Sequence, residues 1–191
     1  MLACLLEKEA TVPDAYPLTA NALRQACNQT SSRDPVVAYD DATVHRALDD
    51  LKAAGLVRFV HPSHGERTIK YRHVVDERLG LDRGELAILA VLALRGPQTA
   101  AEVRSRTERA HPFESVGDVE DLLRRLSARD EPLVVELSRR RWAHLLAGPV
   151  DPDAAPVAVA AAPRADRIGE LEAEVADLRQ RLERIERELG I

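Results

Sequence analysis

The chain of 191 residues repeats itself, and this internal duplication constrains its fold more than any other feature. The segment PLTANALR at 17–24 matches PQTAAEVR at 97–104, and VHRALDDL at 44–51 matches VEDLLRRL at 119–126. Similarity at matched positions indicates that one structural unit is built twice. The two halves are therefore expected to share a fold.

Both copies show the same order of predicted elements. In the second copy, capping patterns at 82–85, 99–102 and 115–118 start three helices. Apolar residues then alternate around a basic turn at 132–146, which predicts a β-hairpin. The first copy has three expected helices and an expected hairpin, at 1–10, 18–28, 40–55 and 56–75.

Three helices followed by a two-stranded wing define the winged helix-turn-helix. The sequence therefore predicts a mainly α protein with small β-hairpins, built as two tandem winged helix-turn-helix domains plus a C-terminal coiled-coil helix. The predicted first domain spans 1–80, the second 81–147, a Pro/Ala-rich linker 148–165 and the coiled-coil helix 166–191.

Composition agrees with a helical protein and limits how it could bind nucleic acid. Aromatic residues make up only 3% of the chain, so its cores must use Leu, Val, Ile and Ala, which favours packed helices. The net charge is −5, and the excess of acidic groups lies after residue 147. Because neither predicted domain is strongly basic, any binding of nucleic acid must use a local patch.

Cysteine usage and hydropathy bear on location. Cys4 and Cys27 do not form a metal-ligand spacing and no signal peptide precedes them, so a reducing cytoplasm is expected. The longest apolar run, at 86–94, is about half of the ~20 residues that a membrane helix needs. We expect a core helix there and no membrane partner.

The turn between the second and third helices differs between the copies. It runs over about 28–40 in the first copy but only about 109–114 in the second. Its sequence, within ACNQTSSRDPV at 26–36, is rich in hydrogen-bonding groups. In one interpretation these groups satisfy the loop itself, with Cys27 buried and Asn28 in a left-handed conformation that closes the helix. In the other, four side chains contact phosphate or a partner protein: Gln29, Ser31, Ser32 and Arg33.

Two long segments resemble a known family. CLLEKEATVPDAYPLTANALRQACNQTSSRDPV and LRGPQTAAEVRSRTERAHPFESVGDVE are similar to the two halves of the bacterial YceH-like family, and the resemblance extends over the whole chain. It implies a tandem winged-helix fold and no established biochemical activity. Family members carry several more residues before CLLEK, so the resemblance also implies that the first helix is shortened here and that its groove is partly open.

The end of the chain has the pattern of a coiled coil. Apolar residues recur at alternating spacings of three and four, and the flanking charges attract one another in a parallel pair but include repulsive contacts in an antiparallel one. A parallel homodimer is expected, and the alternative is a helix that packs on its own chain. The predicted seam consists of Ile168, Leu171, Val175, Leu178, Leu182, Ile185 and Leu189.

Candidate contacts to nucleic acid lie in the wings more than in the third helices. The third helices begin with carboxylates, which suit the helix dipole but repel phosphate. The wings carry basic side chains that could straddle a backbone, although they could also be no more than solvated tips. The candidates are Arg46, Arg58, Arg67, Lys70 and Arg72 in the first copy, and Arg139, Arg140 and Arg141 in the second.

Signals of catalysis are weak in this sequence. It has no phosphate-binding glycine loop, nucleophile elbow or zinc-protease helix. His61, His64 and His73 lack a carboxylate or thiolate at a convincing metal spacing, and Cys27 has no histidine nearby in the sequence. We therefore expect no catalytic residue, metal or cofactor. The expected function is a dimeric, non-enzymatic regulator that associates with DNA, and the alternative is a module that binds a partner protein.

Overall fold

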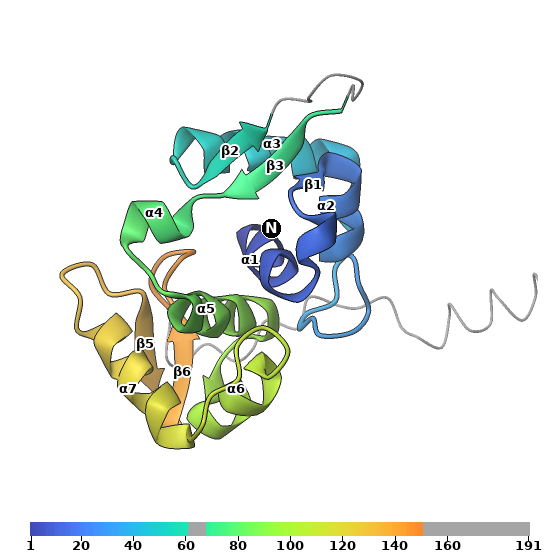
Figure 1. Ribbon diagram of the computed structural model, residues 1–191. Coiled ribbons are helices and arrows are strands. Elements are labelled where there is room, and N and C mark those ends of the chain that lie inside the picture. Colours follow the sequence, from blue (N-terminus) through green and yellow to red (C-terminus); the bar gives the residue numbers. More distant parts are fainter. Residues whose placement is uncertain (61–67, 151–191) are drawn as a thin grey trace, which may run out of the picture. The chain divides into compact units, whose positions relative to one another are not determined.

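The computed structural model describes residues 1–60 and 68–150 (Figure 1). In the first copy, helices precede a pair of strands, as the sequence predicts. Its elements are α1 (Leu2–Thr11), a 3-10 turn (Pro13–Ala15), β1 (Leu18–Thr19), α2 (Ala20–Cys27), α3 (Asp41–Ala53), β2 (Val57–Val60), β3 (Lys70–His73) and the short α4 (Val75–Leu79).

The second copy repeats this order. Its elements are α5 (Arg83–Arg95), β4 (Gln98–Thr99), α6 (Ala100–Thr107), α7 (Val116–Ser127), β5 (Val134–Leu137), a 3-10 turn (Ser138–Arg140) and β6 (Arg141–His144). The described part of the chain is thus mainly helical with two small antiparallel sheets, as expected.

Each sheet has a third strand that the sequence analysis did not predict. The strand orders are β1-β3-β2 and β4-β6-β5, and all pairs are antiparallel. β1 and β4 are two residues long and run directly into α2 and α6. A two-residue strand is too short to give an alternating pattern in the sequence.

Helix starts follow the capping patterns predicted for the second copy. Asp82 accepts from the amide of Glu85 at 2.9 Å, and the Glu85 side chain accepts from the amide of Asp82 at 2.9 Å. Equivalent reciprocal bonds start α6 and α7. All three predicted capping boxes are confirmed, and each satisfies amide groups that have no partner within the helix.

Two apolar clusters form the interior, and α1 contributes to both. Leu5 lies in the cluster of the first copy with Leu23 and Leu48, while Leu6 lies in the cluster of the second copy with Ile88. Consistent with this, α1 packs against α5. Burying each of these side chains contributes about 1.5–3 kcal/mol.

The contact between the copies is therefore part of the interior. Met1–Ala155 form one compact unit, within which the predicted boundary at residues 80 and 81 stays a prediction. The helices of residues 1–60 and 68–150 include none that is long and apolar enough to cross a bilayer. The predicted linker, the coiled-coil seam and the tip of the first hairpin lie outside the described residues.

Candidate functional site

The loop between α2 and α3 spans residues 28–40, as predicted, and its base is closed by Asn28. The Asn28 amide group donates to the carbonyl of Tyr39 at 2.9 Å, and the Asn28 side-chain oxygen accepts from the Tyr39 amide at 2.8 Å. The left-handed conformation expected at Asn28 is wrong, because its φ is −85°. Ser32 has the positive φ instead, at 59°.

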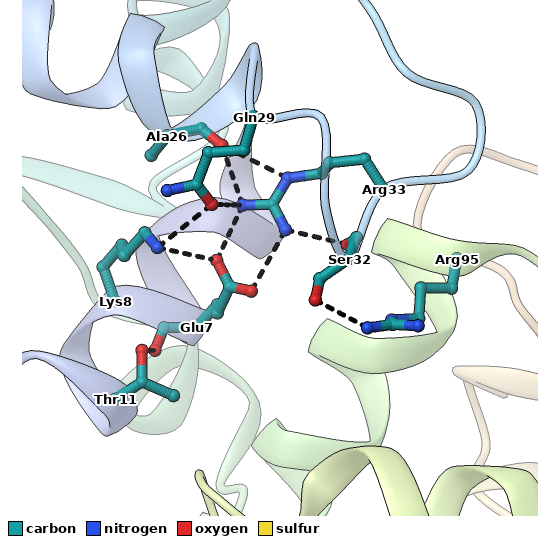
Figure 2. A network of polar contacts seen from close by, with 8 residues as sticks. All are labelled: Glu7, Lys8, Thr11, Ala26, Gln29, Ser32, Arg33 and Arg95. Atoms are coloured by element: carbon teal, nitrogen blue, oxygen red, sulfur yellow. Dashed lines mark hydrogen bonds and ion pairs between the residues drawn. The ribbon is translucent and has the colours of Figure 1, made fainter.

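Arg33 lies at the centre of a buried polar network (Figure 2). Its two terminal nitrogens donate to the two carboxylate oxygens of Glu7 in α1, at 3.0 and 2.7 Å. Its Nε and Nη2 also donate to the carbonyl of Ala26 in α2, at 3.2 and 2.7 Å. The remaining contacts of the guanidinium are to the Gln29 side chain and the Ser32 carbonyl.

This geometry meets the requirements of a buried ion pair. Removing both charges from water is costly, and the cost is offset only when the contact is close and the other donors are satisfied. Burial raises the pKa of Glu7, but the hydrogen bonds and charge of Arg33, together with Lys8, outweigh burial and leave the pKa below its ordinary value. Glu7 is therefore ionised at neutral pH.

The same loop also contacts the second copy. The amide of Asp34 donates to the carbonyl of Leu94 at 2.8 Å, and Arg95 at the end of α5 donates to the Ser32 hydroxyl at 2.6 Å (Figure 2). The loop thus joins α1, α2 and the C-terminal end of α5. Its hydrogen-bonding capacity serves the contact between the two copies.

The loop candidates for nucleic-acid contact have different surroundings. Arg33 is wrong as a candidate, because its side chain is only 3% exposed and its donors are bound within the protein. Gln29 is half-buried and accepts from Lys8 as well as from Arg33. Ser32 is exposed but accepts from Arg95. Ser31 is exposed and keeps its status as a candidate.

Two arginines of the first hairpin share a single carboxylate. Arg58 and Arg72 lie opposite each other on β2 and β3. Arg58 lies 2.9 Å from Glu77 of α4, and Arg72 contacts the other oxygen of the same carboxylate. This pairing weakens the attraction that either arginine would exert on a phosphate.

The other first-copy candidates are less close to one another. Arg46 is exposed on α3, whose surface also carries the exposed carboxylates of Asp49 and Asp50. Lys70 is half-buried at the start of β3, opposite Val60 of β2. Arg67 lies outside the described residues, as do His61 and His64.

The turn between β5 and β6 presents the second copy's three arginines. Arg139 and Arg140 are exposed and have positive φ values of 59° and 58°. Within the part of the chain that the structure describes, no hydrogen bond or ion pair engages either guanidinium. Arg141, at the start of β6, donates to the carbonyl of Pro97. The turn therefore displays two arginines whose charge is not neutralised by a carboxylate.

Basic groups on α7 differ from those of this turn. Arg124 contacts Glu120 and Asp121 at 2.9 and 2.8 Å, and Arg125 contacts Asp82 and Glu85 at 3.0 and 2.9 Å. Both arginines are thus paired within the fold. The third helix of the second copy has little unpaired positive charge to offer a nucleic acid.

His73, a weak metal candidate in the sequence, is buried in the first copy. Its Nε2 lies 2.5 Å from a carboxylate oxygen of Glu9, and its Nδ1 lies 3.6 Å from Asp76. Its backbone amide donates to the Tyr16 hydroxyl at 2.7 Å. Residues 1–60 and 68–150 bring together no group of three side chains suited to a metal ion.

The fold and this surface define a class of protein in which two copies of a helix and sheet unit are joined by a buried Arg–Glu pair. The chain belongs to the family described as "Protein of unknown function, DUF480", which matches residues 1–142. This confirms the uncharacterised bacterial family that the sequence resembles.

Curated relatives cover most of the chain. It is 47% identical over 191 residues to a UPF0502 protein of Geotalea uraniireducens, a match that covers 92% of this chain and 85% of the relative. The identity to a UPF0502 protein of Opitutus terrae is also 47%, over 94% of this chain and 80% of the relative. A UPF0502 protein of Leptothrix cholodnii is 41% identical, over 100% and 93% of the two chains.

Proposed function

We propose that each copy is a winged helix-turn-helix and that the protein is a non-enzymatic, cytoplasmic factor that associates with DNA through its hairpins. The order of three helices and a hairpin supports this assignment in both halves. In each half a short strand between the first two helices also completes a three-stranded sheet. The function itself is argued from the side chains, because a fold alone does not identify one.

The observation that carries the proposal is the β5–β6 turn. Arg139 and Arg140 are adjacent, exposed and unpaired among the described residues, and they lie at the tip of a hairpin. A guanidinium can donate two parallel hydrogen bonds to a phosphate, and such contacts hold a protein on a duplex without reading its sequence. We therefore assign the turn to the DNA backbone.

The helices argue against strong recognition of bases. α3 exposes Asp49 and Asp50 beside Arg46, and Arg124 of α7 is bound to two carboxylates. Base recognition needs unpaired donors at the surface of a groove, and phosphates repel these carboxylates. The proposal is therefore of general affinity for duplex DNA with modest dependence on sequence.

Dimerisation belongs to the same proposal. The heptad seam from Ile168 to Leu189 would pair two chains in parallel and bring two such turns to one duplex. Linked contacts raise the overall affinity beyond that of either one. No catalytic role is proposed, because Cys27 and His73 are both buried in the first copy.

A salt titration of binding to a random-sequence duplex, followed by fluorescence anisotropy, tests this proposal. The wild type should bind at low salt, with affinity falling as salt rises. The variant R139A/R140A should have a slope shallower by about 1.8 for each chain that contacts the duplex. The matched control R83A/R124A removes two exposed arginines of α5 and α7 and should keep the wild-type slope. No binding, or equal slopes for all three proteins, would reject the assignment.

The second candidate function is a module that binds a partner protein. The exposed carboxylates on α3, together with domains of nearly balanced charge, favour this alternative over strong DNA binding. Affinity purification after nuclease treatment separates the two candidates. Enrichment of one partner protein that survives nuclease, and is lost in D49N/D50N, would support this second function.

A further inference from the structure

The two cysteines of the chain, which are distant in the sequence, meet in the core of the first copy. Cys4 lies in the first turn of α1 and Cys27 is the last residue of α2. Each is 2% exposed, and both belong to the same apolar cluster. Neither cysteine is in a disulfide in this structure. The sequence shows no motif that would reveal this pairing.

The surroundings of the two thiols differ from an ordinary apolar core. The thiols are hydrogen-bonded to each other, and the positive charges of Arg33 and the chain's amino group act on Cys4, opposed by Glu7. The hydrogen bond from Cys27 outweighs burial and lowers the pKa of Cys4 to about 7. The same contact, together with burial, raises the pKa of Cys27. Cys4 is thus the sulfur that ionises, and Cys27 is its proton donor.

We propose that Cys4 and Cys27 are a modification site at which a small hydroperoxide forms a reversible disulfide. The Cys4 thiolate attacks the outer peroxide oxygen, the O–O bond breaks, and the alkoxide or hydroxide takes a proton and leaves as alcohol or water. Cys27 then loses its proton and attacks the Cys4 sulfenic sulfur, which releases hydroxide that leaves as water. Two thiols are oxidised to one disulfide and one peroxide is reduced.

The position of the pair explains both the choice of oxidant and the consequence. Because each cysteine is only 2% exposed, a small neutral peroxide can reach the sulfurs more readily than a bulky disulfide reagent. The new bond would tie the first turn of α1 to the residue just before the 28–40 loop. Oxidation would thereby constrain the junction that Arg33 and Glu7 already hold together.

Intact-mass measurement of the full-length chain after treatment with hydrogen peroxide tests this site. We expect a loss of two hydrogens, protection of both cysteines from alkylation, and full reversal by a dithiol. A peptide map should join the Cys4 and Cys27 peptides of one chain. The reaction rate should rise with pH to half its maximum near pH 7, the value to which the pKa of Cys4 is lowered.

Two single variants separate the roles of the sulfurs. C27S should stop at a Cys4 sulfenic acid, seen as one added oxygen and trapped by a dione reagent, whereas C4S should react far more slowly. Circular dichroism shows whether each variant is folded, and the wild-type experiment does not depend on either. A disulfide between two chains, separate oxidation of each cysteine, or no reaction in the folded wild type would overturn the proposal.

Discussion

At the residue scale, Arg33 and Glu7 show what a charged pair needs inside a protein. The guanidinium makes two bonds to the carboxylate and two more to the carbonyl that α2 leaves unsatisfied near its end. A buried pair satisfied in this way resists the loss of either partner, because the remaining charge would be left without compensation. We therefore regard Arg33 as a structural residue of the junction between the copies.

Replacing Arg33 by methionine tests this role, because methionine keeps the apolar stem and removes the charge. R33M should lower the free energy of unfolding by about 3 kcal/mol, since Glu7 remains buried without its partner. Urea denaturation followed by circular dichroism measures the change. The control S32A removes one hydrogen bond at an exposed position and should cost about 1 kcal/mol or less. A loss in R33M no larger than in S32A would argue against the role.

The contribution of the pair should also depend on pH. The pKa of Glu7 in the folded protein is below its ordinary value of 4.5. Such a carboxylate stabilises the fold above the unfolded pKa, and this contribution is lost as pH falls through the folded pKa. The difference in unfolding free energy between wild type and E7Q should be constant above about pH 6 and shrink below about pH 4.5. Urea midpoints measured across this range would contradict the account if the difference did not change.

The pairing of Arg33 could not be predicted from the sequence. Its partner Glu7 lies 26 residues away on another element, and no spacing or motif connects the two. The density of polar groups in 28–40 did indicate that the loop needed internal hydrogen bonds, and this is what the structure contains. Ser32 and Arg95, 63 residues apart, likewise meet only because the two copies pack together.

At the scale of elements, the β5–β6 turn combines an unusual backbone with charge. The sequence predicted a tight basic turn, but not that two consecutive arginines would adopt positive φ. This conformation brings the β-carbon close to the following carbonyl and costs about 1–2 kcal/mol per non-glycine residue. Glycine would adopt it without that cost, so the backbone alone does not favour arginine at these positions.

The variant R139G/R140G separates the two properties of this turn. We expect a free energy of unfolding within about 1 kcal/mol of the wild type, because the relief of the left-handed backbone offsets the greater freedom of glycine in the unfolded chain. Duplex affinity at low salt should fall about tenfold, as in R139A/R140A, because both variants lose the same charges. Thermal unfolding and anisotropy measure the two quantities. Wild-type affinity in the glycine variant would show that the arginines are not the contact.

The short elements mark the limit of prediction at this scale. Helices with clear capping patterns were predicted correctly, because Asp82, Thr99 and Ser115 carry local signals. The strands β1 and β4 were missed because each exists only through pairing with a hairpin strand that follows much later in the chain. Such strands depend on tertiary contacts more than on their own two residues.

At the scale of the whole described unit, the duplication predicted the order of elements but not how the copies pack. Leu6 of α1 belongs to the core of the second copy, and Leu94 of α5 packs against the core of the first. Matching sequences show that two units exist, whereas the residues that join them are not duplicated. The elongated loop, present in only one copy, is the clearest sequence signal of that junction.

The central claim is that the β5–β6 turn contacts duplex DNA, and amide chemical-shift mapping tests it most directly. A short random-sequence duplex is titrated into labelled full-length protein at low salt. The account predicts the largest shifts at the amides of 138–141, smaller shifts on α7, and little change at the buried Arg33. Shifts centred on the α3 surface, or no shifts at all, would contradict it.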